Sequence, residues 1–452
     1  MGGKWTDQNK VIPGAYINYI GVAPVVAELG SRGIATMPVA LDWGKEGEVI
    51  EILSTDLLDG SSEEKIGYTS MDVEALTVIE CLKYTYKLLA YRINGGGDNS
   101  KVTITSGTAP DPILTLKADA IYSGVAGNNI TIVVAESTSK LGYFDVITLY
   151  RNREKDRQTI MLSQNLVSNA WVEFTGTGAP PLTAGAPLTG GTNGTIENTN
   201  YNDYIAAVES KTWNTMGIPS TEATLASTFI SFIKNRRDNV GKMSQVVLFD
   251  SNTADYEGVV SVNQGYKTKV AEITPANFVA TVTGLTAGAS KTTSNTARVL
   301  TDAIEIVGEV AIADLEDKLK AGYFLIGFNT EGKVEVIKDI NTHTTFTKEK
   351  PYTLSKNLPI RIIDSIDYDT KVLFEKSYKG KAMNSVGKRD SLKATEGNMI
   401  ITGYVENDIV SDFDPVSDIT ISQGTAIDSV RIDMSLKVLD AMEILYMNVY
   451  LK

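Results

Sequence analysis

The sequence contains one histidine and one cysteine, the residue types that most often act as a general base and as a nucleophile. His343, in the segment INTHTTFT, would have to serve any Ser-His-Asp triad. It follows a predicted strand in a threonine-rich loop without a patterned partner, so we interpret it as a loop histidine. Cys81 lies in an apolar helical pattern, which favours a core thiol over a nucleophile.

A spaced acidic cluster is the other chemical candidate. The segment SDFDPVSD places Asp412, Asp414 and Asp418 at intervals that resemble a calcium loop. A calcium loop would need a further ligand near position 416 and then a glycine, but Val416 and Ser417 stand there. We therefore predict an acidic surface turn. Because no nucleophile elbow, Walker A loop or dinucleotide fingerprint occurs either, the sequence predicts no enzyme, no cofactor and no metal.

Composition limits the class of protein. The chain has 452 residues, a net charge of −13 and a single cysteine. This length predicts two to four domains, and the acidic balance argues against a nucleic-acid binder. A lone cysteine allows no intramolecular disulfide, which favours a reducing compartment. The polar N-terminus and the absence of an 18-residue apolar run predict neither a secretory signal nor a membrane insertion.

Two glycine-rich stretches, at 94–100 and 176–195, are typical of linkers and divide the elements that would position these residues. Between them short β-branched runs predict a small β-sandwich. Outside them the pattern alternates between helix and strand, which is typical of α/β packing. The predicted helices cover 70–92, 202–216, 224–241, 312–322 and 359–381. The predicted strands cover 244–250, 323–329 and 334–340, followed by four strands in the tail, of which the first is NMIITGYVEN.

A local excess of positive charge lies between positions 371 and 393. This segment contains seven basic and two acidic residues, so its net charge is +7 − 2 = +5. The basic residues are Lys371, Lys376, Lys379, Lys381, Lys388, Arg389 and Lys393. They form either a solvated helix face or a docking surface for an acidic partner, since complementary charge sets orientation.

The two ends of the chain carry apolar strand patterns. The closing segment AMEILYMNVYLK is apolar on both faces, as in a strand at the middle of a sheet. The segment GAYINYIGV near the N-terminus also alternates. The candidate residues are Tyr16, Ile17, Tyr19 and Ile20 at one end, and Leu445, Tyr446, Met447, Val449, Tyr450 and Leu451 at the other. Whether the sheet that receives the closing strand belongs to the same molecule is the question this pattern raises.

Four segments together resemble contractile tail sheath proteins of myophages, defective prophages and phage-tail-like bacteriocins of Gram-positive bacteria. They are WTDQNKVIPGAYINYIGV, SRGIATMPVALDWG, YSGVAGNNITI and DAMEILYMNVYLK, and they occur in the order of that family. The resemblance implies an α+β multidomain fold. Its parts are an N-terminal arm (1–25), the start of the body (26–95), an inserted β-sandwich (96–190), a subtilisin-like α/β body without a catalytic site (191–350), a tube-facing α+β domain (351–440) and a C-terminal arm strand (441–452).

The resemblance also implies a structural function. Subunits would stack as hexameric rings around an inner tail tube, meet baseplate and terminator proteins, and contract while terminal arms add strands to neighbouring subunits. Assembly would occur in the bacterial host cytoplasm, and the product would be a virion or a phage-tail-like particle. The patch at 371–393 would face the tube, and Gly14, Gly21 and Gly424 are candidate hinges of the arms. The alternatives are a degenerate subtilisin-like hydrolase and a surface-binding module.

Overall fold

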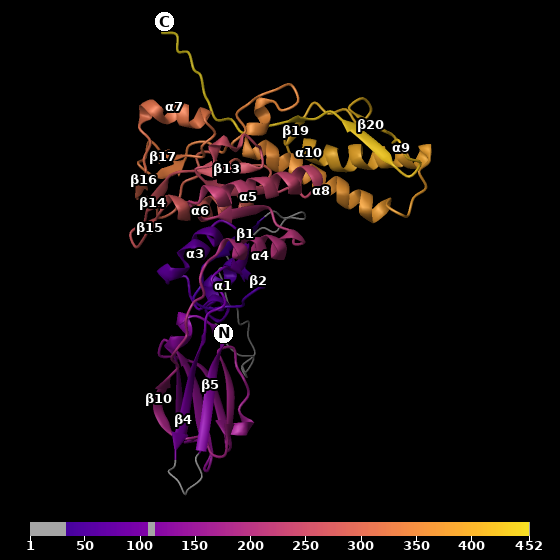
Figure 1. Cartoon of the computed structure of the whole chain (residues 1–452). Helices are drawn as coiled ribbons and strands as arrows, with labels where there is room; N and C mark the ends of the chain where they lie inside the picture. Colours follow the sequence, from indigo (N-terminus) through magenta and orange to yellow (C-terminus); the bar gives the residue numbers. More distant parts are fainter. Residues whose placement is uncertain (1–32, 107–113, 452) are drawn as a thin grey trace, which may run out of the picture. The chain divides into compact units, whose positions relative to one another are not determined.

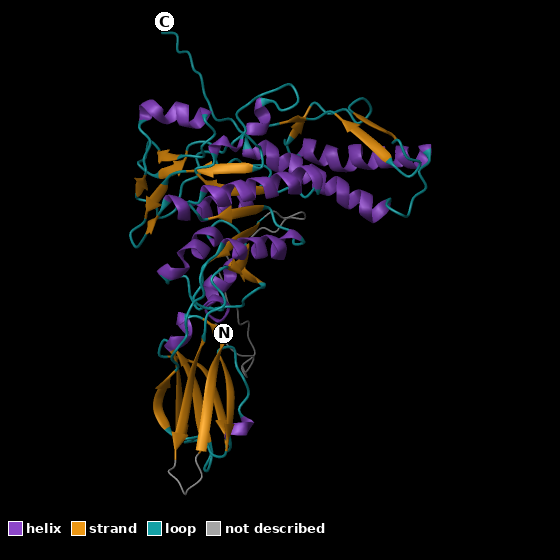
Figure 2. Ribbon diagram, viewed as in Figure 1, coloured by secondary structure: helices purple, strands orange, loops and turns teal. Residues whose placement is uncertain are grey.

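The computed structural model describes residues 33–106 and 114–451. The N-terminal arm candidates Tyr16, Ile17, Tyr19 and Ile20, and the hinge candidates Gly14 and Gly21, lie outside the described residues. The fold is a mixed α/β structure with several separate sheets (Figure 1, Figure 2).

The largest sheet has six strands in the order β13-β12-β11-β1-β3-β2. Its strands are β1 (Ile34–Val39), β2 (Val49–Leu53), β3 (Lys87–Arg92), β11 (Thr215–Ile218), β12 (Gln245–Phe249) and β13 (Val259–Val262). All neighbours are parallel except β2, which runs antiparallel to β3. Strands such as β11 and β13 are buried along their whole length because helices cover both faces of the sheet.

Helices α3 (Leu76–Leu82) and α6 (Pro275–Gly288) pack on one face of this sheet, and α4 (Asn198–Glu209) and α5 (Ala223–Lys234) pack on the other. Gly284 permits the close approach of α6 to α3, because an added Cβ would lie 2.2 Å from the carbonyl oxygen of Cys81. A π-helical turn (Asn235–Asn239) continues α5.

The single helix predicted over 70–92 is wrong in its second half. The helix α3 ends at Leu82, and Lys87–Arg92 form the strand β3 between β1 and β2. A strand buried on both faces has the same continuous apolar run as a buried helix, so periodicity did not separate the two.

Two sheets form the predicted β-sandwich. One contains β4 (Asn99–Ser106), β5 (Leu114–Ser123) and β9 (Val172–Thr177), and the other contains β10 (Thr183–Pro187), β6 (Ile130–Glu136), β7 (Phe144–Tyr150) and β8 (Arg153–Ile160). The two sheets lie face to face (Figure 2), and their inner side chains share one apolar core. The interpretation of 176–195 as linker alone is wrong, because β10 lies within it and pairs with β6. An edge strand tolerates glycine and proline, since one side of it makes no ladder.

Smaller elements complete the body. They are α1 (Ser54–Asp59), α2 (Ser62–Ile66), α7 (Ile312–Lys320), a sheet of β14 (Gly265–Lys267), β15 (Glu272–Ile273) and β16 (Glu305–Val307), and a hairpin of β17 (Ile326–Phe328) and β18 (Val334–Val336). The helix predicted at 312–322 and the strand predicted at 244–250 are confirmed by α7 and β12.

The C-terminal part is built on the long helix α8 (Asn357–Ser377), as predicted for 359–381. It is followed by α9 (Val386–Thr395), a π-helical segment (Glu396–Ile401), α10 (Thr402–Glu406) and two small antiparallel pairs. These pairs are β19 (Val410–Ser411) with β22 (Lys437–Val438), and β20 (Ile419–Gln423) with β21 (Val430–Met434). The strand predicted at NMIITGYVEN is wrong: these residues are helical, and Ile401 and Tyr404 pack against α8.

None of the helices within residues 33–106 and 114–451 is long and apolar enough to cross a membrane.

Candidate functional site

The most exposed apolar segment of the described chain is its C-terminal end. Leu445, Tyr446, Met447, Val449, Tyr450 and Leu451 are between 69% and 95% exposed. Residues 444–451 make no hydrogen bond or ion pair within the described chain, and Figure 1 draws them as a single trace beyond the last strand. Adjacent exposed apolar side chains of this kind are typical of interaction sites, which makes this segment a candidate.

The segment leaves the fold at a charged anchor. Glu443 forms an ion pair with Lys356, whose side chain is only 2% exposed, and accepts a hydrogen bond of 2.7 Å from Thr296 Oγ1. Asp440 lies 3.7 Å from the same ammonium group. Burial raises the pKa of Asp440 and the Lys356 ammonium lowers it, with a net upward shift. The anchor therefore joins the tail to the first turn of α8 and to the loop before β16.

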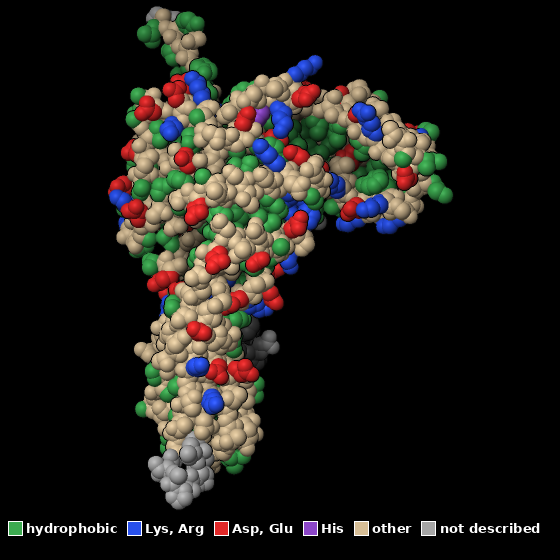
Figure 3. All heavy atoms as spheres, viewed as in Figure 1, with side chains coloured by type: hydrophobic (Ala, Val, Ile, Leu, Met, Phe, Trp, Pro, Cys, Tyr) green, Lys and Arg blue, Asp and Glu red, His purple; other side chains and the backbone are tan. Residues whose placement is uncertain are grey.

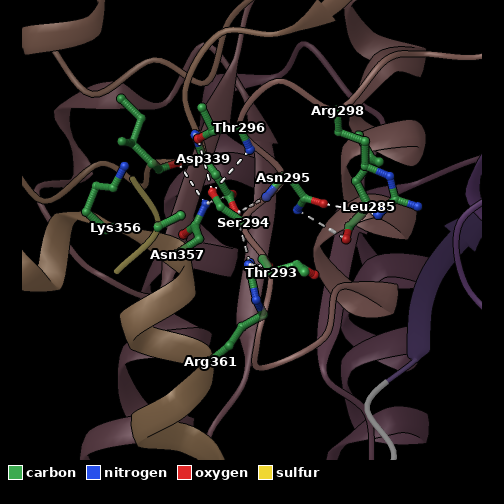
Figure 4. A network of polar contacts seen from close by, with 12 residues as sticks. Leu285, Thr293, Ser294, Asn295, Thr296, Arg298, Asp339, Lys356, Asn357 and Arg361 are labelled. Atoms are coloured by element: carbon green, nitrogen blue, oxygen red, sulfur yellow. Dashed lines mark hydrogen bonds and ion pairs between the residues drawn. The ribbon is translucent and has the colours of Figure 1, made fainter. Parts of the chain in front are cut away.

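A buried network lies beneath the anchor (Figure 4). The carboxylate of Asp339 accepts from Arg361 Nη1 at 3.0 Å, from the backbone amide of Asn295 at 2.9 Å and from Asn357 Nδ2 at 2.9 Å. Burial alone would raise the pKa of Asp339, but Arg361 and these donors hold it below its ordinary value. The backbone amide of Asp339 donates to Thr296 Oγ1 at 2.9 Å, so the network connects directly to the anchor.

The sequence pattern predicted neither the anchor nor the network beneath it. For the network a signal was present in the run PIRIIDSI, in which Arg361 and Asp364 interrupt an otherwise apolar start of α8. Charged residues inside an apolar run are seldom buried without partners, so each predicts a buried partner of opposite charge.

The hairpin β20–β21 is the second part of the site. Its side chains Ile421 and Ile432 are paired across the strands, and Ile419 packs beneath it on α9. Along β21 runs a pocket of about 290 Å³ between the hairpin and α8, lined by Phe374, Leu392, Val430 and Ile432 with Lys371 and Lys379 at the rim. Figure 3 shows green side chains in hollows of this region. In the part of the chain that the structure describes, the outer edges of β20 and β21 have no strand partner.

The basic residues of the patch lie at the end of α8, in the following loop and on α9. Two of them pair with acidic neighbours on α8: Lys371 with Asp367 at 2.6 Å and Lys379 with Glu375 at 3.4 Å. Lys381, Arg389 and Lys393 bind backbone or amide oxygens. Lys376 and Lys388 have no ion pair within the described residues.

Gly424 does not lie where the C-terminal segment leaves the fold. It closes the β20–β21 hairpin, where its amide donates to the Ser429 carbonyl at 3.0 Å and an added Cβ would lie 2.3 Å from Ser429 Oγ. The last residue of the tail that is paired with the fold is Glu443, 19 positions further along the chain.

The residues first considered for chemistry lie apart from this site. His343 lies in a loop, as predicted, but its ring is buried and contacts Asp255 Oδ1 at 3.5 Å and the Lys350 carbonyl at 3.2 Å. Cys81 is fully buried in the core, as predicted. The acidic segment forms a turn in which the Asp414 amide donates to Asp418 Oδ2 at 2.8 Å. No group of acidic, histidine or cysteine side chains suited to a metal occurs among the residues described.

Comparisons with known proteins define the class. Family models for the phage tail sheath protein match almost the whole chain: the Gp18 domain III N-terminal region at 32–93, the beta-sandwich domain at 95–193, the central domain at 194–342 and the C-terminal domain at 349–452. The chain belongs to the phage tail sheath proteins.

Individual relatives agree with this assignment. The chain is 32% identical over 473 residues to the phage-like element PBSX protein XkdK of Bacillus subtilis, covering 98% of each. It is 36% identical to the sheath tail protein of Desulfitobacterium hafniense, whose crystal structure matches with a TM-score of 0.80 over 96% of this chain and 99% of that one. The contracted helical sheath of the anti-feeding prophage shares the fold alone, with 10% identity, a TM-score of 0.53 and coverage of 98% and 99%.

Proposed function

We propose that this chain is the structural subunit of a contractile tail sheath, and that its C-terminal segment 444–451 is an arm that adds a strand to a neighbouring subunit. The observation that carries this proposal is the exposed apolar end of the chain, fixed to the fold by a buried ion pair. An apolar strand pattern without a partner in its own chain is suited to strand addition in another copy.

The acceptor we propose is the outer edge of β21. A strand added there would direct alternate side chains toward the pocket lined by Phe374, Val430 and Ile432. Main-chain hydrogen bonds contribute about 1 kcal/mol each, whereas ordering the backbone costs about 1–2 kcal/mol per residue. Burial at roughly 25 cal/mol per Å² must therefore supply the remainder, which explains why the arm needs Leu, Met and Val side chains.

The same subunits would stack as hexameric rings around an inner tube and meet baseplate and terminator proteins at the ends of the sheath. The basic patch is our candidate for the surface that faces the tube, because Lys376 and Lys388 are free of ion pairs among the described residues. Assembly would take place in the host cytoplasm, and the product would be part of a virion or a tail-like particle.

The body would serve as a rigid framework. Its mainly parallel sheet with helices on both faces supports a subtilisin-like arrangement that combines β11, β12 and β13 of 191–350 with β1, β2 and β3 of 26–95, and the matched family segments support the proposed division into domains. We propose no catalytic role, because among the described residues the polar contacts of the His343 ring are to Asp255 and the Lys350 carbonyl, with no serine.

Deletion of residues 444–452 tests the arm. We expect a folded subunit, verified by circular dichroism and thermal melting, that no longer forms sheath-like tubes in negative-stain electron microscopy. The matched control is Leu141→Ser, which removes an equally exposed apolar side chain from the sandwich and should leave tubes unchanged. Tubes formed by the truncated subunit would refute the arm.

Charge reversal tests the tube-facing patch. Lys376, Lys379 and Lys381 changed together to glutamate should reduce co-sedimentation with purified tube. The control reverses three exposed lysines of the body, Lys320, Lys333 and Lys348, with the same change in net charge. Equal binding of both triple variants would count against this surface.

A further inference from the structure

The last contact between the tail and the fold is at Glu443. Before it, Leu436 and Val438 pack at the edge of the α8 core, β22 pairs with β19 over two residues, and the Lys437–Asp412 ion pair of 2.7 Å is 68% and 73% exposed. Exposed pairs of this kind contribute about 0–1 kcal/mol. After Glu443, no hydrogen bond or ion pair occurs within the described chain.

The Lys356–Glu443 pair differs from these contacts by its burial. The side chains of Lys356 and Glu443 are 2% and 12% exposed. Glu443 and Asp440 are the acidic groups that face this ammonium among the described residues. A buried ammonium that loses its hydrogen-bonded carboxylate is destabilised, so Glu443 is held in place by the cost of leaving Lys356 with Asp440 alone, at 3.7 Å.

The pair also joins three segments that are far apart in the sequence. Glu443 comes from the tail, Lys356 precedes α8, and Thr296 lies in the loop after α6 and is bound in turn by the backbone of Asp339. Asp339 is fixed by Arg361 and Asn357 of α8 (Figure 4). The attachment point is therefore rigid, and a load on the tail would pass into α8 and the body together.

We propose that the Lys356–Glu443 pair is a latch that sets the length of the C-terminal arm, with Ile444 as its first free residue. This inference rests on the proposed function of the arm. At about 3.3 Å per extended residue, opening the latch would free residues 440–443 and add roughly 13 Å of reach. A closed latch would hold every arm of a ring to one length, and hence every neighbour to one spacing.

The experiment measures the exit of the tail in the unassembled full-length subunit. Nitroxide labels on Ile444→Cys and Lys320→Cys, both exposed positions, give a distance distribution by pulsed electron paramagnetic resonance, while fully buried Cys81 stays unlabelled. With the wild-type latch we expect one narrow peak. Glu443→Gln should widen it roughly twofold or more, because local release of the tail populates many positions.

Two further variants keep the test decisive. Lys356→Gln combined with Glu443→Gln removes both charges of the buried pair, leaves only the half-buried Asp440 without its cation, and should widen the peak equally. Asp412→Asn breaks the exposed ion pair on the same tail and should leave the peak unchanged. Wild-type distributions in both Glu443 variants would overturn the latch. Deletion of residues 444–452 tests the arm independently, since it removes the strand and leaves Glu443 in place.

Discussion

Arg237 and Asp364 form a buried two-bond ion pair between positions 127 residues apart, at 2.9 Å and 2.8 Å. Arg237 belongs to the π-helical turn after α5, and Asp364 belongs to α8. Although burial lowers the pKa of Arg237, the Asp364 carboxylate raises it on balance. This pair connects the helix that carries the C-terminal site to the central sheet.

Asp364→Asn should destabilise the subunit by about 3–5 kcal/mol, because Arg237 would remain buried without a counter-charge. Urea unfolding followed by circular dichroism measures the change. Asp367→Asn, one turn away in a half-exposed pair with Lys371, is the control and should cost about 1 kcal/mol or less. Equal losses in the two variants would contradict a special role for the buried pair.

Glu396 makes a prediction about pH. Its carboxyl is fully buried, Oε1 accepts from Thr370 at 2.6 Å, and Oε2 has no partner among the described residues. Burial, together with the nearby Asp369, raises its pKa, although the Thr370 hydroxyl acts in the other direction. The folded protein therefore keeps Glu396 protonated to a higher pH than the unfolded chain does. The contribution of the protonated carboxyl to the free energy of unfolding is complete below the ordinary pKa of glutamate, and it is lost as pH rises through the raised pKa.

Glu396→Gln should therefore unfold at higher urea concentration than wild type at pH 7, and the difference should shrink as pH falls toward about 4. Glu406→Gln, at an exposed position on α10, is the control and should leave the urea concentration of unfolding unchanged at both pH values. If Glu396→Gln instead lowers the stability by the same amount at both pH values, ionisation of the buried carboxyl does not destabilise the wild-type subunit.

The junction of the sandwich and the body depends on an aromatic stack. Trp171 of the sandwich stacks on Tyr150 and on Trp43 of the body, with ring centroids 4.3 Å and 5.4 Å apart. Trp171→Ala should cost about 3–5 kcal/mol and increase proteolytic cleavage around 94–100. Phe346→Ala, at a half-exposed aromatic, should cost much less. Unchanged cleavage in Trp171→Ala would mean that the junction is held by other contacts.

Cys81 should be inert in the native subunit. Burial raises the pKa of its thiol, and the side chain is fully enclosed between α3 and α6. Ellman's reagent should react with it only at the rate of unfolding, and rapidly in urea. An engineered surface cysteine, Ser139→Cys, reports the rate of an accessible thiol. Native labelling of Cys81 at that rate would contradict its placement in the core.

The sequence predicted the elements whose pattern is local. The helix α8 has a 3.6-residue period bounded by Pro359 and Gly380, and the sandwich strands have a two-residue period. The strand β3 was missed because a buried parallel strand lacks a distinguishing period. The segment 398–407 was mistaken for a strand because Ile401, Thr402 and Val405 favour strands, whereas packing on α8 makes it helical.

Within the candidate site, too, the sequence predicted the local pattern and missed the contacts between distant residues. The exposed end at 444–451 was visible because apolar residues on both faces of a strand need a partner. The Lys356–Glu443 pair joins residues 87 positions apart, and no local period records such a contact. The pocket along β21 likewise depends on the packing of α8 against the hairpin, and a local sequence pattern does not predict such packing.

Interchain disulfide formation can show whether the arm of one subunit pairs with β21 of another. One subunit carries Val449→Cys with a purification tag, and a second carries one engineered cysteine at one of positions 430–434, with the buried Cys81 retained in both. Opposed residues on paired strands have Cβ atoms about 4.5–5.5 Å apart, and the closer, non-hydrogen-bonded pairs, which alternate along the strand, approach the roughly 3.5–4.5 Å that a disulfide needs. We predict a covalent dimer of the two chains in assembled sheaths, at alternate positions along β21 and absent from unassembled mixtures. Assembled sheaths in which Val449→Cys links to none of these positions would contradict the account.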